Sequence, residues 1–143
     1  MATQANLNLT QQLYVAYYGR PADSEGLNYW ADRIENEGLD SAINAFGNSD
    51  EFQEEFGSLS NAQLVNNLYQ QLFGRAAEPD GLAYWSGVLN NEEKSLAEIA
   101  VTIKNAAGGI DKQTFNARVE AAKNYTEDFG SAEFYDVVAA KVP

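Results

Sequence analysis

The sequence contains no cysteine and no histidine among its 143 residues. Disulfides, thiol nucleophiles and serine–histidine pairs are therefore excluded, and so are the usual zinc and copper sites. A bound metal would need oxygen ligands, which are the ligands that calcium and magnesium prefer. We expect no enzymatic activity, because the many carboxylates follow the pattern of exposed helix faces and no nucleophile motif accompanies them.

Basic residues are scarce as well. Lys and Arg together number 9 against 21 Asp and Glu, which gives a formal net charge of −12. Nucleic acids and anionic lipid surfaces both require clustered positive charge, so we expect neither as a partner. No apolar run approaches the roughly 18 residues of a membrane span. The first residues lack the basic and apolar regions of a signal peptide. We therefore expect neither membrane insertion nor an amino-terminal signal peptide.

What the sequence does contain is an internal repeat. Residues 13–30 read LYVAYYGRPADSEGLNYW, and residues 68–85 read LYQQLFGRAAEPDGLAYW, with a constant offset of 55. Nine of the 18 positions are identical, where chance would give about one. The identical pairs are Leu13/Leu68, Tyr14/Tyr69, Gly19/Gly74, Arg20/Arg75, Ala22/Ala77, Gly26/Gly81, Leu27/Leu82, Tyr29/Tyr84 and Trp30/Trp85. This repetition predicts two equivalent structural units.

Each copy is predicted to fold as a helix, a short loop and a second helix. Apolar residues recur every three or four positions on both sides of the loop. Gly19 and Gly74 are predicted to end the first helices in a left-handed conformation. Asp23 should cap the second helix in copy one, and Pro79 suits the first helical position in copy two.

The rest of the chain has the same helical periodicity and no convincing strand pattern. We therefore predict a single all-α domain over residues 1–143, with about eight helices and two pseudo-symmetric helix–loop–helix repeats. The repeats are assigned to residues 6–57 and 60–107, and terminal helices to residues 111–141. Asn6, Ser60 and Asp111 are predicted to cap helices, and Ser131 to begin the last one.

Arg20 and Arg75 directly follow the helix-ending glycines. An arginine offers a planar fork of donors that could clamp an anion. It could instead satisfy loop carbonyls and stack on the nearby tryptophan. Identical placement in both copies favours the structural role. The same role is assigned to the other shared residues of the motif, Gly19, Gly26, Trp30, Gly74, Gly81 and Trp85.

Four tyrosines are candidates for stacking on a ligand such as a sugar: Tyr17, Tyr18, Tyr29 and Tyr84. Adjacent residues of a helix point about 100° apart, so a Tyr–Trp pair cannot face the core equally. Tyrosine has a flat apolar face and a polar tip. We therefore predict that Tyr29 or Tyr84 is partly exposed, whereas Trp30 and Trp85 are mostly buried in the core.

The two loops are acidic. Asp23 and Glu25 in the first copy, and Glu78 and Asp80 in the second, could offer oxygen ligands to calcium. Neither loop has the 12-residue spacing of an EF-hand. Helix capping and compensation of the helix dipole explain the same residues. Calcium is thus the only cofactor that the sequence suggests, and we expect no high-affinity site.

The repeated signature, L-Y-x4-G-R-x2-D/E-x2-G-L-x-Y-W, resembles that of a bacterial domain family of unknown function. That family occurs in S-layer-type and calcium-repeat (RTX-type) secreted surface proteins. Residues 48–52 and 115–126 resemble two further elements of the family, so the resemblance covers about residues 9–135. The second copy departs from it where Ala106-Ala107-Gly108-Gly109 replaces an S-x-E-F element. The signature is also similar to that of phycobilisome linker domains.

The resemblance implies a place outside the cell, on the surface of a Gram-negative bacterium reached by type I secretion. The chain would then be the amino-terminal region of a larger secreted or S-layer-type protein. We expect a non-catalytic module that anchors this protein to surface polysaccharide or lipopolysaccharide, or to neighbouring protein subunits. The alternative is a protein–protein assembly or linker module without glycan contact.

Overall fold

A computed structural model describes residues 2–47, 49–131 and 135. The described residues form helices and no strand, so the predicted all-α, single-domain fold is confirmed. The helices are α1 (Gln4–Tyr18), α2 (Ser24–Glu37), α3 (Leu39–Gly47), α4 (Asp50–Phe56), α5 (Asn61–Phe73), α6 (Pro79–Asn90), α7 (Leu96–Ala106) and α8 (Gly109–Phe129). The helix predicted to begin at Ser131 falls almost entirely outside the described residues.

Helices α1 and α2 form the first copy of the repeat, and α5 and α6 form the second. Gly19 and Gly74 follow α1 and α5 in the left-handed region, at φ 68° and φ 70°. Asp23 caps α2, because its carboxylate accepts the N–H of Gly26. Pro79 takes the first position of α6, where a missing N–H costs nothing. The predicted boundaries of both loops are confirmed.

Two of the predicted helix starts are wrong. Thr3 caps α1 and accepts the N–H of Asn6, which lies inside the helix. Asp111 lies in the first turn of α8, which begins two residues earlier at Gly109. In contrast, Ser60 caps α5 as predicted, in a reciprocal capping box. An Asn or Asp in a first turn is hard to distinguish from a cap, because both positions favour these side chains.

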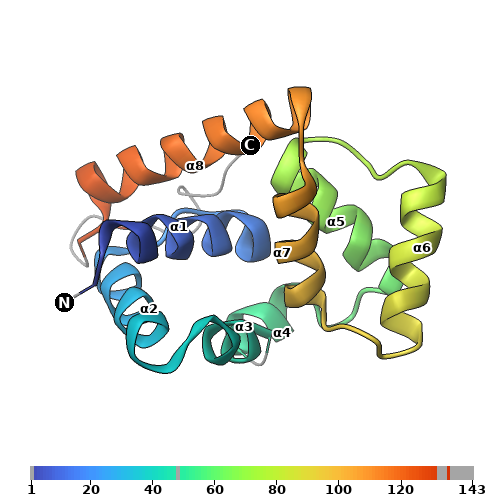
Figure 1. The fold of residues 1–143 in the computed structure, drawn as a ribbon, viewed down its shortest axis with the longest axis horizontal. Helices are drawn as coiled ribbons and strands as arrows, with labels where there is room; N and C mark the ends of the chain where they lie inside the picture. Colours follow the sequence, from blue (N-terminus) through green and yellow to red (C-terminus); the bar gives the residue numbers. More distant parts are fainter. Residues whose placement is uncertain (1, 48, 132–134, 136–143) are drawn as a thin grey trace.

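Helix α1 lies at the centre of the core. Every residue from Leu13 to Tyr18 is buried, because α1 packs against α2, α5, α7 and α8. Helix α8 runs along one side of both α1 and α5 and so joins the two repeats (Figure 1). Helices α2 and α6 lie at opposite ends of the molecule (Figure 1). Their outer faces therefore point to solvent at two separated places.

Candidate functional site

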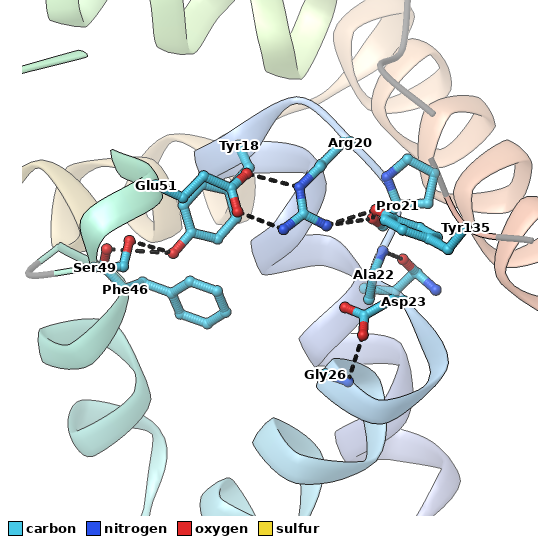
Figure 2. Close-up of polar contacts among 11 residues, drawn as sticks. Tyr18, Arg20, Pro21, Ala22, Asp23, Gly26, Phe46, Ser49, Glu51 and Tyr135 are labelled. Atoms are coloured by element: carbon cyan, nitrogen blue, oxygen red, sulfur yellow. Dashed lines mark hydrogen bonds and ion pairs between the residues drawn. The ribbon is translucent and has the colours of Figure 1, made fainter. Parts of the chain in front are cut away.

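Arg20 lies in a buried network that ties the first loop to distant parts of the chain (Figure 2). Its side chain is only 7% exposed. Nε and Nη2 donate to the two carboxylate oxygens of Glu51 at 2.7 and 2.5 Å. Nη1 donates to the Pro21 carbonyl at 3.0 Å and to the Tyr135 hydroxyl at 2.6 Å. The bond to the Pro21 carbonyl is the kind of loop contact that the structural interpretation predicts.

Electrostatics in this network favour a permanently charged Arg20. Burial lowers its pKa, but the hydrogen bonds that it donates to Glu51 and the nearby negative charge outweigh burial, so the net pKa is raised. The guanidinium also lies 4.9 Å from the ring centre of Tyr14. Burial raises the pKa of Tyr135, whose hydroxyl donates in turn to the Pro21 carbonyl, to about 12. Burial raises the pKa of Tyr14 as well, so both tyrosines stay neutral beside the cation.

Arg75 makes the equivalent contacts at a more open place. Its Nε and Nη2 donate to Asp111 at 3.0 and 2.7 Å, and Nη1 donates to the Ala76 carbonyl at 3.0 Å. Its side chain is 36% exposed. Hydrogen bonds from Arg75 lower the pKa of Asp111. The two arginines thus share one binding pattern, but Arg75 is the more exposed of the two.

A second interaction common to both loops was missed in the sequence. The Gln11 side chain accepts the N–H of Ala22 at 2.8 Å, and Asn66 accepts that of Ala77 at 3.1 Å. Both amides precede the repeated motif at the same offset of 55. The matching offset could have revealed this pair. However, Gln11 and Asn66 are different residue types, and both lie before the repeated stretches 13–30 and 68–85. In the first copy the network extends to Thr126 of α8, which donates to the Ala22 carbonyl.

The structure separates the four candidate tyrosines into two pairs. Tyr29 and Tyr84 are 58% and 64% exposed, which confirms the predicted exposure. Trp30 and Trp85 are partly buried against the core. Each tryptophan meets its neighbouring tyrosine edge-on, with ring centres 5.0 Å apart in the first copy and 4.8 Å in the second.

The prediction that Tyr17 and Tyr18 offer a ligand-binding surface is wrong. Both are buried, because other helices surround this end of α1. The Tyr18 hydroxyl lies 2.8 Å from the Ser49 hydroxyl (Figure 2), and burial raises the pKa of Tyr18 to about 12. Their rings belong to the aromatic core around Phe46.

The acidic candidates do not come together. Asp23 caps α2, whereas Glu78 forms an ion pair with Arg75 at 2.9 Å. Glu25 and Asp80 are exposed in the first turns of α2 and α6, at opposite ends of the molecule (Figure 1). Within the described residues, no three acidic side chains gather as a metal site would require.

A cavity of about 200 Å³ opens beside the second repeat. Its wall combines aromatic rings of α5 and α6 with residues of α7 and the start of α8. The lining residues are Tyr69, Phe73, Arg75, Glu78, Trp85, Ile103, Ala106, Ala107, Gly108 and Asp111. Apolar rings beside a few convergent charged groups are typical of a binding site. The sequence did not predict this cavity.

Residues 43–109 match the model of a family described as a domain of unknown function, DUF4214. The resemblance to a domain family of unknown function is thereby confirmed over this region, which includes the second copy of the repeat. No curated protein matches the chain, and no solved structure matches it. No helix in the described part of the chain is long and apolar enough to cross a membrane.

Proposed function

We propose that this chain is a non-catalytic module that attaches an exported protein to polysaccharide, including lipopolysaccharide, on the cell surface. Tyr29 and Tyr84 carry the proposal. They hold equivalent positions in the two repeats, and both expose more than half of their surface to solvent. Exposed tyrosine rings suit sugars, because the flat face stacks on the apolar side of a sugar ring and the hydroxyl can form hydrogen bonds.

The edge-on tryptophan behind each tyrosine supports this role. Trp30 and Trp85 are partly buried and pack against the core, and we expect their edges to restrict the movement of the exposed ring. A ring that is already held loses less conformational entropy when it binds. The net charge of −12 offers no long-range attraction to an anionic polysaccharide. Short-range contacts of this kind would therefore have to supply the affinity.

The two tyrosines lie on α2 and α6 at opposite ends of the molecule (Figure 1). A polymer with repeating units can engage two such sites at once, so the second contact becomes intramolecular. Two weak sites can thus give firm retention on a polysaccharide-coated surface. The proposed location, outside a Gram-negative cell after type I secretion, is supported by the resemblance of the repeated signature to secreted surface proteins.

Retention on lipopolysaccharide-coated beads tests the proposal. The variants are Tyr29→Ala, Tyr84→Ala and the double variant, and Phe129→Ala serves as the control because Phe129 is an exposed aromatic outside the repeats. We expect each single variant to be retained less, because bivalence is lost, and the double variant to lose retention by more than about 10-fold, because no site is left. The control should behave as wild type.

Thermal unfolding of each variant shows whether it is folded. Because Tyr29, Tyr84 and Phe129 are exposed, we expect their substitution to leave the melting temperature unchanged. Full retention of a folded double variant would contradict the role of the tyrosines. If wild-type protein itself is not retained, the assembly or linker function replaces glycan attachment.

A further inference from the structure

The correspondence of the two repeats extends beyond the loops to α3 and α7. Each of these helices follows the second helix of its repeat, and their apolar residues have the same spacing. Leu39, Ala42, Ile43 and Phe46 in α3 correspond to Leu96, Ile99, Ala100 and Ile103 in α7. The last corresponding position therefore holds an aromatic residue in the first repeat and an aliphatic residue in the second.

In the first repeat, Phe46 fills the space between α1 and α2. Its ring stacks on Trp30 with the ring centres 4.9 Å apart and the planes at 29°. It also meets Tyr14 at 5.3 Å and Tyr18 at 5.2 Å. Phe46 is only 2% exposed, so its ring is buried among these aromatic side chains. Tyr14, Tyr18 and Trp30 thus lie closest around the ring that α3 supplies, and Tyr17 lies further away, at 6.3 Å (Figure 2 shows Phe46 beside Tyr18).

In the second repeat the same three positions are Tyr69, Phe73 and Trp85, and all three line the cavity of about 200 Å³. Ile103 lines it too but supplies no ring. An apolar cavity of roughly 150 Å³ is enough to hold a benzene ring. The second repeat therefore has an aromatic cage whose central ring is missing.

The mouth of this cage is acidic. It is lined by Arg75, Glu78 and Asp111. One positive charge is thus accompanied by two negative charges. Both carboxylates contact Arg75, but the Glu78 side chain is exposed and makes no helix-cap hydrogen bond. It can therefore turn to an incoming cation. The net charge of −12 adds attraction for a basic partner and repels an acidic one.

We propose that this cavity binds an aromatic side chain of a partner polypeptide, with a basic residue next to it in the partner's sequence. The ring would stack on Trp85 as Phe46 stacks on Trp30, and the basic group would reach Glu78. Buried aromatic anchors of this kind dominate the affinity of protein interfaces. The proposal is independent of glycan attachment, since neither Tyr29 nor Tyr84 lines the cavity.

A short peptide, acetyl-Gly-Phe-Lys-Gly-amide, is the probe for this site. The protein is labelled with 5-fluorotryptophan, so that Trp30 and Trp85 give two ¹⁹F NMR signals. We expect the peptide to shift the Trp85 signal saturably, with a dissociation constant on the order of 1 mM for a single anchor. The Trp30 signal is the internal control and should not move. Replacing Phe by Leu in the peptide should weaken binding about 10-fold, and replacing Lys by Glu several-fold.

Two protein variants fill the cavity from within. Ile103→Phe supplies the missing ring from α7, and Ala106→Phe adds a ring from a lining position that is exposed rather than buried in the core. Both should abolish the peptide-induced shift while the protein stays folded. Asn105→Phe is the matched control, because it adds the same ring to an exposed position of α7 that does not line the cavity. The control should bind as wild type.

Three results would overturn the proposal. The first is a Trp85 signal that does not move up to 10-fold above the expected dissociation constant. The second is a folded Ala106→Phe variant that binds the peptide as wild type does. The third is a Trp85 signal that moves with protein concentration alone, since that would assign the cavity to a second copy of the chain. Loss of glycan retention would leave this proposal intact, because that assay uses other residues.

Discussion

Replacing each arginine of the repeated motif by alanine should destabilise the protein to different degrees. Arg20 and Arg75 make matching contacts with a carboxylate and with the next carbonyl along the chain. They differ in exposure, at 7% and 36% of the side chain. Arg20 also donates to Tyr135, a contact without a described counterpart in the second repeat.

The expected magnitudes follow from this difference. Removing one partner of a buried ion pair costs about 3–5 kcal/mol, because the other charge is left uncompensated. Glu51 is 29% exposed and can recover some hydration, so we expect about 3 kcal/mol for Arg20→Ala. A solvent-accessible pair is worth about 0–1 kcal/mol. The additional carbonyl contact of Arg75 brings the expected cost of Arg75→Ala to about 1 kcal/mol.

Urea unfolding, followed by circular dichroism, measures both free energies of unfolding. Lys112→Ala is the control, because Lys112 is exposed on α8 and no ion pair is found for it among the described residues. Equal costs for the two variants would refute the reasoning from burial. A cost below about 1 kcal/mol for Arg20→Ala would show that its network contributes little. If Arg75→Ala leaves stability unchanged but abolishes ligand binding, the anion-clamp interpretation replaces the structural one.

Three further predictions concern packing, pH and calcium. Gly26→Ala should cost about 1–3 kcal/mol in urea unfolding, because an added Cβ would lie 2.5 Å from the Tyr14 hydroxyl, whereas Gly81→Ala should be nearly neutral with its nearest contact at 3.3 Å. Buried Tyr18 and Tyr135 have pKa values raised to about 12, above roughly 10 in unfolded chains. Their contribution to stability should therefore be complete below pH 10 and be lost between pH 10 and 12, as alkaline titration followed by circular dichroism would show; a native spectrum at pH 12 would contradict this. Calorimetry should detect no sub-micromolar calcium binding. Sub-micromolar binding that disappears when the acidic residues of either loop are replaced would overturn that expectation.

Much of the local structure could be predicted because its causes are local. Gly19 ends α1 in the left-handed region, which glycine adopts without steric cost. Asp23 and Ser60 cap helices through hydrogen bonds to residues three positions later. The exposure of Tyr29 and Tyr84 follows from helix geometry, since the tryptophan beside each turns to the core. These interactions join residues that are close together in the chain, so they can be predicted from the local sequence.

Burial around α1 could not be predicted in this way. Periodicity marks the face of a helix that packs against one neighbour. Tyr17 and Tyr18 are buried because α1 has neighbours on several sides, and their number is a property of the whole fold. The partners of the arginines are equally remote, with Glu51 31 residues from Arg20 and Asp111 36 residues from Arg75. Acidic residues are abundant throughout the sequence, so nothing local distinguishes these two.

The sequence by itself thus determined the helices, the loops, several of their caps and the twofold repetition, because these depend on contacts a few residues apart. Tertiary structure alone decided which repeat is filled and which is open. Phe46 and Ile103 both look like ordinary core residues in their helices. Only when α3 and α7 pack beside their repeats does one supply a ring and the other leave a cavity. The physical reason is volume: the two repeats offer similar space, and the residue that must fill it comes from a separate helix.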